Sequence, residues 1–217
     1  MIDLHTHTLF SDGELLPSEL VRRAETIGYQ AIALTDHADS SNLDWIIPRI
    51  VQACEDLNAH WKIRAIPGIE LTHLPPEIIG SMAGKARALG ARLVVVHGES
   101  VVEPVPPGTN RKAIEAGVDI LAHPGLISEE EIHLAREKKV FLEISARKGH
   151  SLANGHVARL AQKCGASMIL NTDSHSPDDL ITLGKARVVA LGAGLGEENF
   201  NRMVQNSRRI VERLFRE

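Results

Sequence analysis

The chain has 217 residues, of which 43% are apolar and 24% are charged, a composition sufficient for one well-packed hydrophobic core. Lysine and arginine number 24 against 28 aspartates and glutamates, for a formal net charge of -4, which disfavours non-specific binding to nucleic acid or to anionic membranes. The sequence contains no run of 18 apolar residues and no leader-like start, so it predicts a cytoplasmic protein without a membrane span.

Short aliphatic runs alternate along the chain with amphipathic stretches, which is typical of repeated βα units on a parallel sheet. Seven runs are predicted as strands: Ile2–His5, Ala31–Leu34, Arg64–Leu71, Arg92–Val96, Val118–Ala122, Val140–Ser145 and Ser167–Asn171. Helices are predicted from Pro17 to about Gly28 and over 43–60, 76–89, 109–116, 129–138, 154–164, 177–183 and 197–215. Because Pro48 cannot donate a backbone hydrogen bond, the second helix is expected to start late. With no composition shift to mark a boundary, residues 1–217 are expected to form a single domain.

Three further segments carry expectations about packing and access. The stretch Gly98–Gly108 is the one long irregular connection and is expected at the edge where the strands end, where it could act as a lid. The glycines of Gly192–Gly196 lack the spacing of a nucleotide-binding fingerprint, so a loop is expected there. The apolar face of the last helix is expected to pack on the chain's own barrel. Both cysteines, Cys54 and Cys164, are expected to be reduced and buried.

Histidines and carboxylates recur where the predicted strands end. They are His5, His7, Asp12, His37, Glu70, His97, His123, Asp173 and His175. The carboxyl ends of parallel strands converge on one mouth of a barrel, and residues two apart on a strand, such as His5 and His7, share a face. Imidazoles and carboxylates without thiolates suit Zn, Mn or Fe. Nine candidates exceed the needs of one ion, so the sequence predicts two or three divalent ions, with Glu70 as a bridging ligand.

Other polar residues near the predicted strand ends each allow two interpretations. Asp36 is expected either to orient a ligand imidazole or to cap a helix. Glu143 is expected inside the barrel, hydrogen-bonded to a neighbour, rather than as a direct metal ligand. Arg147 and Lys148 follow the sixth strand, where they would either clamp a substrate phosphate or form a solvated loop. The remaining histidines are expected outside the metal set: His60, His73, His133, His150 and His156.

The motifs at the strand ends resemble those of the PHP (polymerase and histidinol phosphatase) domain family, in particular its compact histidinol-phosphatase-like branch. They are Asp-Leu-His-Thr-His-Thr at 3–8, Ser-Asp-Gly at 11–13, Leu-Thr-Asp-His at 34–37, Gly-Ile-Glu at 68–70, Val-His at 96–97, Ala-His-Pro at 122–124 and Asn-Thr-Asp-Ser-His at 171–175. The resemblance implies an α/β fold, a distorted (β/α)7 TIM-like barrel, with a trinuclear metal centre.

Carried over by matching motif, the resemblance also implies three ligand sets. His5, His7, Glu70 and Asp173 would hold one ion, Glu70, His97 and His123 a second, and Asp12, His37 and His175 a third. Many relatives have histidine where this chain has Asp12, which makes the third site the one that departs from the family pattern.

The leading hypothesis for function is metal-dependent hydrolysis of a small phosphate monoester by a metal-bound hydroxide, with Glu70, His97 and Asp173 in the catalytic machinery. The net charge and the 3% aromatic content favour a small phosphorylated substrate over nucleic acid. The alternatives are a nuclease or phosphodiesterase acting on nucleotides, and a non-catalytic PHP-like subunit of a nucleic-acid-processing assembly. An amidohydrolase is disfavoured, because its frequent bridging lysine would fall at His97.

Overall fold

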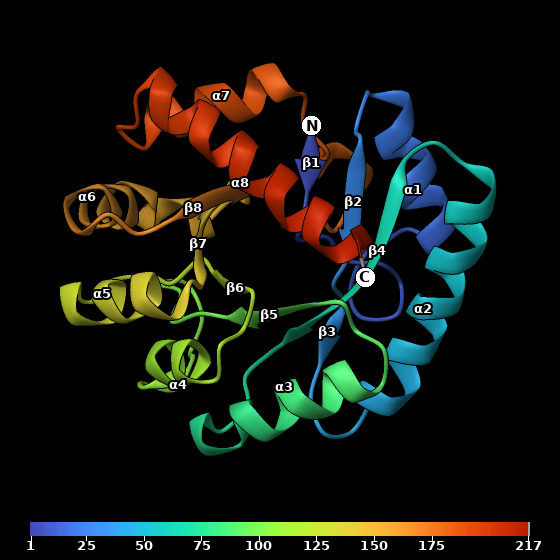
Figure 1. Ribbon diagram of the computed structural model, residues 1–217, viewed down its shortest axis with the longest axis horizontal. Coiled ribbons are helices and arrows are strands. Elements are labelled where there is room, and N and C mark those ends of the chain that lie inside the picture. Colours follow the sequence, from blue (N-terminus) through green and yellow to red (C-terminus); the bar gives the residue numbers. More distant parts are fainter. Residues whose placement is uncertain (217) are drawn as a thin grey trace.

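The computed structural model describes residues 1–216 and shows a ring of parallel strands with helices around it (Figure 1). The strands are β1 (Ile2–Asp3), β2 (Ala31–Leu34), β3 (His37–Ala38), β4 (Arg64–Leu71), β5 (Leu93–His97), β6 (Ile120–Ala122), β7 (Phe141–Ser145) and β8 (Met168–Asn171). The α-helices are α1 (Pro17–Thr26), α2 (Leu43–His60), α3 (Ile79–Ala88), α4 (Thr109–Glu115), α5 (Glu129–Lys138), α6 (Asn154–Cys164), α7 (Leu183–Gly192) and α8 (Glu197–Arg216). Short 3-10 turns lie at Pro76–Ile78, His150–Ala153 and Pro177–Asp179.

The strands form one parallel path in the order β1-β2-β4-β5-β6-β7-β8, and the short strand β3 continues beyond β2 to pair with β4. The path returns on itself just past the ends of β1 and β8, where Thr6 and Ser174 form a parallel bridge. There the His7 N–H donates to the Ser174 carbonyl at 2.8 Å, and the Asp173 N–H donates to the His5 carbonyl at 3.0 Å. The α/β barrel that the family resemblance implies is therefore confirmed.

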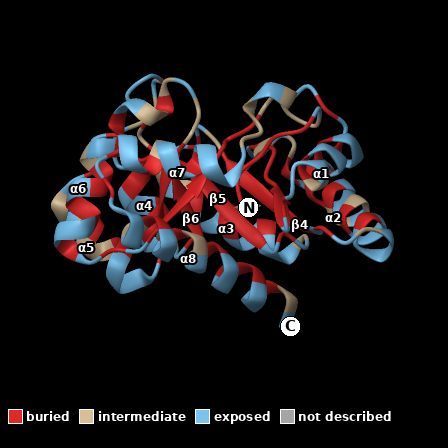
Figure 2. Ribbon diagram, turned by 90° about the horizontal axis from the view of Figure 1, so that it is seen from above, coloured by how far each residue is buried: buried red, intermediate tan, exposed pale blue. Residues whose placement is uncertain are grey.

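Two apolar layers hold the barrel together. The larger one lies between the strands and the surrounding helices, whose exposed faces point outward (Figure 2). The smaller one fills the barrel with short aliphatic side chains such as Ala33 and Val95, together with Ile210, Val211 and Leu214 of α8. Helix α8 thus closes the amino-terminal end of the barrel, as expected from its apolar face, and the strand carboxyl ends remain as the open mouth.

Several helix boundaries differ from those predicted; α3, for example, begins at Ile79 rather than at Pro76, after a 3-10 turn. Helix α2 begins at Leu43 and contains Pro48, because its buried apolar face against β4 outweighs the hydrogen bond that the proline cannot make. The helix predicted over 177–183 is wrong: a single 3-10 turn ends at Asp179, and α7 begins at Leu183 instead. The Thr182 hydroxyl accepts a hydrogen bond from the Lys185 N–H and so sets this start. The expected loop over 192–196 begins one residue later, since Gly192 ends α7.

Residues 1–216 bear on two expectations, one about the cysteines and one about membrane spans. Cys54 and Cys164 are buried free cysteines, as expected. Within that range, every helix is either too short or too polar to cross a bilayer.

Candidate metal centre

Strand register places the first and last predicted ligand pairs side by side. The Thr6–Ser174 bridge sets His5 and His7 on one strand extension beside Asp173 and His175 on the other. His5 and His7 share one face because side chains alternate along an extended chain, and Asp173 Oδ1 lies within 3.6 Å of Nε2 of both. The His7 and His175 rings stack with centroids 4.0 Å apart. The stacked rings of His7 and His175 thus link the first and last strands of the barrel at its mouth.

Register also aligns the middle ligands. His37 in β3 lies opposite Glu70 in β4, and His97 at the end of β5 lies opposite Ala122, one residue before His123. The resulting contacts are close: His37 Nδ1 is 2.7 Å from Glu70 Oε2, and the His97 and His123 rings are 4.4 Å apart. The nine residues predicted from the strand ends therefore gather at one place.

Two of these residues hold a backbone conformation that L-amino acids rarely adopt. His123 has φ of 27° and Asp173 has φ of 54°. Non-glycine residues in the left-handed region cost of order 1–3 kcal/mol and cluster at functional sites. The strain turns both side chains from the strand direction into the mouth.

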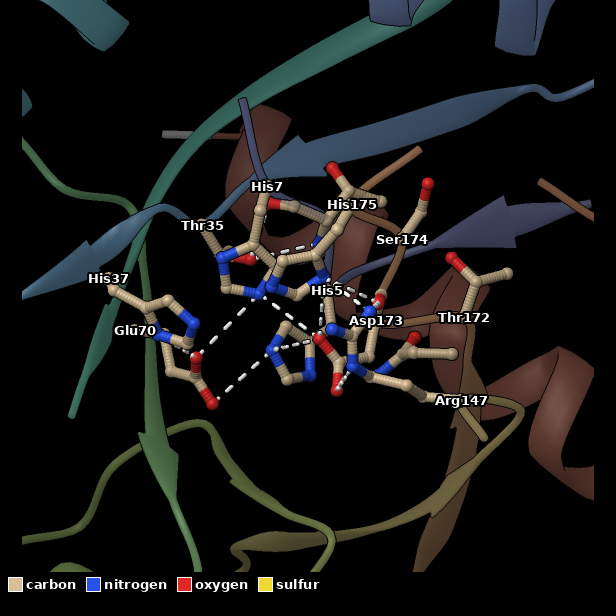
Figure 3. Close-up of polar contacts among 12 residues, drawn as sticks. His5, His7, Thr35, His37, Glu70, Arg147, Thr172, Asp173, Ser174 and His175 are labelled. Carbon is tan, nitrogen blue, oxygen red and sulfur yellow. Dashed lines mark hydrogen bonds and ion pairs between the residues drawn. The ribbon is translucent and has the colours of Figure 1, made fainter. Parts of the chain in front are cut away.

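Two buried carboxylates form the middle of the cluster, facing imidazoles from three strands (Figure 3). Glu70 Oε1 lies 3.2 Å from His5 Nε2, and Glu70 Oε2 lies 3.6 Å from His7 Nε2. Asp173 Oδ1 lies 3.2 Å from His7 Nε2 and 3.6 Å from His5 Nε2. His123 Nε2 is 3.7 Å from both carboxylates. Glu70 and Asp173 thus contact the same three rings.

A second group lies nearer to solvent, around the half-exposed Asp12. Asp12 Oδ1 is 3.2 Å from His175 Nε2, 3.5 Å from His37 Nε2 and 4.0 Å from His7 Nδ1. One ligand atom from each of these four residues lies within 4.8 Å of the others. His7 stands between this group and the two buried carboxylates, with one ring nitrogen facing each.

The chemistry of the buried atoms fits a cationic ligand. Among residues 1–216, seven buried side-chain atoms lack a hydrogen-bond partner, and six belong to the nine predicted ligands: His5 Nε2, both ring nitrogens of His7, Glu70 Oε1, His123 Nδ1 and Asp173 Oδ1. Leaving a buried polar group unsatisfied costs about 1–3 kcal/mol each. Imidazole nitrogens and carboxylate oxygens aimed at one another across 3–4 Å are the donor set of Zn, Mn or Fe sites. Divalent ions there would satisfy these atoms.

The protonation states favoured by the surroundings also suit a metal centre. Burial, reinforced by the neighbouring His37, holds the pKa of His7 well below its usual value, and burial with the neighbouring His97 does the same for His123. Burial opposes ionisation of Glu70, but His5 and His37 outweigh it and lower the pKa of that carboxyl. Neutral imidazoles and an ionised carboxylate are the forms that bind metals. By contrast, burial raises the pKa of Asp173 to about 7.

Glu143 holds one of the predicted ligands in place, as expected for a residue inside the barrel. Its Oε2 accepts hydrogen bonds from His5 Nδ1 at 2.8 Å and from Asn171 Nδ2 at 2.9 Å. Because a carboxylate only accepts, His5 Nδ1 carries a proton, so Nε2 is the nitrogen that could bind an ion at the mouth.

Neither role expected for Asp36 is the one it has. It accepts hydrogen bonds from the backbone and hydroxyl of Thr8 at 2.8 and 2.9 Å and from those of Ser11 at 3.1 and 2.9 Å. These contacts fasten the turn that carries Asp12 to the barrel wall. Asp36 therefore shapes the loop after β1 and contacts no imidazole.

Three residues at the mouth lie outside the nine predicted ligands. His150 stacks on His123 with ring centroids 3.9 Å apart and planes inclined by 13°. Glu103 reaches in from the segment 98–108, and its Oε2 lies 2.9 Å from His97 Nε2 and 3.2 Å from His73 Nε2. The hydrogen bond with His97 contributes most to lowering the pKa of Glu103, to about 2. The position of His150 three residues after Arg147 was the available signal for His150.

A hollow of about 280 Å³ opens above the cluster. Its lining residues are Asp12, His37, Thr72, His73, His97, Glu103, Arg147, His150, Asp173 and His175. Arg147 points toward it: its NH1 lies 2.7 Å from His175 Nδ1 and donates to the Asp173 carbonyl at 3.1 Å. Lys148, for which a phosphate clamp and a solvated loop were the two expectations, is exposed and does not line the hollow, as in a solvated loop.

Comparison with known families and proteins supplies an independent line of information. A family model described as PHP domain matches residues 3–146. A protein of Methanocaldococcus jannaschii, itself uncharacterized, is 49% identical over 215 residues, covering 98% of this chain and 99% of its own. A protein of Thermoanaerobacter sp. named as a probable phosphatase is 26% identical over 91% of this chain and 88% of its own.

Two further similarities concern ribonuclease P. The ribonuclease P protein component 3 of Methanosarcina barkeri is 27% identical over 86% of this chain and 78% of its own. A chain in the cryo-EM structure of an archaeal ribonuclease P with mature tRNA shares the fold, with a TM-score of 0.76, 15% identity and coverage of 100% of this chain and 94% of that chain. At that identity the likeness concerns the fold.

Proposed function

Because this chain belongs to the PHP domain family, we propose that it is a metal-dependent phosphoesterase acting on a small phosphate monoester. The family and the phosphatase relative support a metal-dependent hydrolase. The single observation that carries the proposal is the group of buried, unpartnered imidazole and carboxylate atoms at the mouth. Such atoms are costly unless a ligand satisfies them.

The ion-binding residues are those that the family resemblance implies for this chain. His5, His7, Glu70 and Asp173 would hold one ion, and His97 and His123 would hold a second with Glu70 shared between them. Asp12, His37 and His175 would hold a third, beside the solvent. The close groups His5-His7-Glu70 and His7-Asp12-His37-His175 support the first and third sets. His7 also lies in the third group, but a neutral imidazole has one lone pair, so His7 would ligate the first ion only.

The reaction divides between the ions and the protein. Divalent ions in such a centre neutralise the charge that develops on phosphoryl oxygens and make water a nucleophile near neutral pH. Glu70, His97 and Asp173 hold the positions at which the phosphoryl group must bind. Glu143 fixes the tautomer of His5, and Arg147 offers a guanidinium that can grip two phosphate oxygens.

The size and rim of the hollow favour a small substrate. About 280 Å³ is near the lower limit of the roughly 300–1,000 Å³ typical of small-molecule sites. Of the ten residues that line it, Arg147 is the one arginine or lysine, whereas the continuous phosphate backbone of an oligonucleotide is bound by several. A monoester presents a single dianion, which Arg147 and the ions can enclose.

Phosphate release tests the proposal directly. We expect wild-type protein supplied with Mn, Zn or Fe to hydrolyse at least one monoester in a panel that also contains nucleotides and short oligonucleotides. Glu70→Gln and His97→Ala should each lower turnover at least ~100-fold, because each removes a group required for several kcal/mol of transition-state stabilisation. Glu77→Gln, an exposed carboxylate on the 3-10 turn after β4, is the matched control. Near-wild-type turnover in Glu70→Gln would contradict the assignment.

A second candidate function, a subunit of a nucleic-acid-processing assembly, is favoured by charge at the opposite end of the barrel. Helix α8 carries five arginines and one glutamate between residues 202 and 216. Two of them, Arg209 and Arg213, line a hollow of about 280 Å³ with Arg136 and Lys139. This basic hollow could contact phosphates, and the ribonuclease P relative gives the assembly type.

Oligonucleotide binding separates the two candidates. If the chain is a subunit of a nucleic-acid-processing assembly, it should bind RNA with an affinity that falls steeply as salt rises. Arg209→Glu should weaken this binding. Arg49→Glu, the same charge change on α2, is the control. Phosphate release without RNA binding would support the phosphoesterase and contradict the assembly subunit.

A further inference from the structure

Glu103 brings a carboxylate from the segment 98–108 onto three imidazoles of the mouth. Its Oε2 lies 2.9 Å from His97 Nε2 and 3.2 Å from His73 Nε2, while its Oε1 lies 3.4 Å from His150 Nε2. Of these four residues, only His97 belongs to the nine strand-end ligands. The contact therefore adds chemistry to the mouth that the barrel strands do not supply.

The segment is built to hold Glu103 at that place. At its base, Glu99 Oε1 accepts the N–H groups of Gly108 and Asn110 at 2.9 and 3.0 Å, and Asn110 Oδ1 accepts the Glu99 N–H at 2.9 Å. Asn110 Nδ2 also donates to the Pro124 carbonyl. The anchored ends leave a short exposed bridge, 101–107, with Glu103 as its inward contact.

A strained backbone conformation holds His73 at the mouth, close to His97. Its φ of 51° is a left-handed conformation that a non-glycine residue adopts at a cost of order 1–3 kcal/mol. The conformation sets its ring 5.0 Å from that of His97. Since His97 Nδ1 faces the Gly98 carbonyl at 3.1 Å, its Nε2 is the nitrogen available to the mouth. This is the nitrogen that Glu103 Oε2 approaches.

The donor set is that of a divalent transition-metal site. Two imidazoles and one carboxylate, with ligand atoms within 4.8 Å of one another, match the two-histidine, one-carboxylate sets that leave a position open for substrate. A simple hydrogen bond would need only one of the two imidazoles. Two rings from different strand ends converge on one carboxylate oxygen, as ligands of a common ion would.

We propose that Glu103 and His73 bind, together with His97, the divalent ion that His97 holds, so that this ion fastens the segment 98–108 across the mouth. The inference rests on the metal centre of the proposed function. In this arrangement the segment closes when the ion is present, and a substrate phosphate reaches that ion by sharing or replacing the Glu103 carboxylate. Access to the mouth thereby depends on metal.

The test measures metal retention and exchange of the segment's backbone amides. We expect Glu103→Gln and His73→Ala to lose one ion per chain at chelator concentrations where wild type keeps it, with at least the roughly 10–100-fold loss of affinity that removal of a supporting partner causes. His97→Ala should lose the same ion. Added Mn or Zn should slow amide hydrogen exchange at 100–103 in wild type and in the control Glu77→Gln, but not in Glu103→Gln.

The possible results distinguish failure of this proposal from failure of the metal centre on which it rests. If Glu103→Gln and His73→Ala both keep wild-type metal content and metal-dependent protection at 100–103, while Glu70→Gln loses metal, this proposal is wrong and the metal centre stands. If wild type binds no Mn, Zn or Fe, the metal centre itself is wrong and the proposal is overturned with it. Glu103 is about one-third exposed, so its substitution leaves the folded barrel intact for either measurement.

Discussion

Glu143 Oε2 lies 2.8 Å from Nδ1 of His5, and both side chains are completely buried. Burial disfavours a charge on His5, but the carboxylates of Glu143, Glu70 and Asp173 outweigh it and raise the pKa of the imidazole. In the absence of metal, the buried carboxylates therefore favour a protonated ring. A divalent ion facing Nε2 would take the place of that proton, while Glu143 keeps the ring oriented.

Loss of Glu143 should therefore weaken metal binding more than folding. We expect Glu143→Gln to lower metal affinity by about 10–100-fold, as is typical for partners that orient a ligand imidazole. Competition titration with a chromogenic chelator measures this affinity. The melting temperature of the metal-free protein controls for structural damage. A loss of stability at unchanged metal affinity would contradict the positioning role.

Arg147 is expected to act on substrate binding. Replacing it by alanine removes a charge-assisted hydrogen bond worth about 1.5–3 kcal/mol, which corresponds to a rise in KM of roughly 10–100-fold with a smaller change in kcat. Arg147→Lys should recover only part of this loss, because lysine keeps the charge but lacks the planar fork. Lys148→Ala is the control. Equal effects of the two alanine variants on KM would refute the role of Arg147.

Metal binding should stabilise the fold in proportion to occupancy. An ion at 100 times its dissociation constant contributes about 2.7 kcal/mol, equivalent to a rise in Tm of roughly 5–10 °C for a chain of this size. Scanning calorimetry with and without Mn or Zn measures the shift. Glu70→Gln should abolish most of it. A full shift in that variant would mean that the stabilising ion binds elsewhere.

Asp3, which is not one of the predicted metal ligands, makes the stability of the folded protein depend on pH. Burial is the main cause that raises its pKa from 3.8 to about 6, although its carboxylate accepts a 2.6 Å hydrogen bond from the Thr172 hydroxyl. The folded protein thus holds a proton that the unfolded chain releases, so stability falls as pH rises from about 4 to about 6. The two-unit difference amounts to about 3 kcal/mol.

Urea denaturation of metal-free protein at pH 4.5 and pH 7 checks this expectation. The stability difference between the two pH values should shrink in Asp3→Asn, which does not titrate. Comparing the difference with that of wild type cancels the contribution of the other groups. If Asp3→Asn retains the full wild-type difference, the pH dependence arises from groups other than Asp3.

Local sequence was enough to predict the parallel βα units and the nine strand-end residues, while the barrel was expected from the family resemblance. Apolar runs between amphipathic helices specify parallel strands, and the carboxyl ends of such strands meet wherever the sheet closes. His37 and Glu70 could therefore be placed at one mouth without knowledge of their distance, which the pairing of β3 with β4 then set at 2.7 Å.

Contacts between residues far apart in the chain were decided by the tertiary structure alone. His150 stacks on His123, and Glu103 contacts His73, because irregular segments follow the surface they pack on and carry no periodic signal of their own. Asp36 holds the turn at Thr8 and Ser11 for the same reason. The protonation of each buried group likewise depends on charges brought close only by folding. Strand periodicity determined where the ligands lie, and packing of the loops determined which further residues reach them.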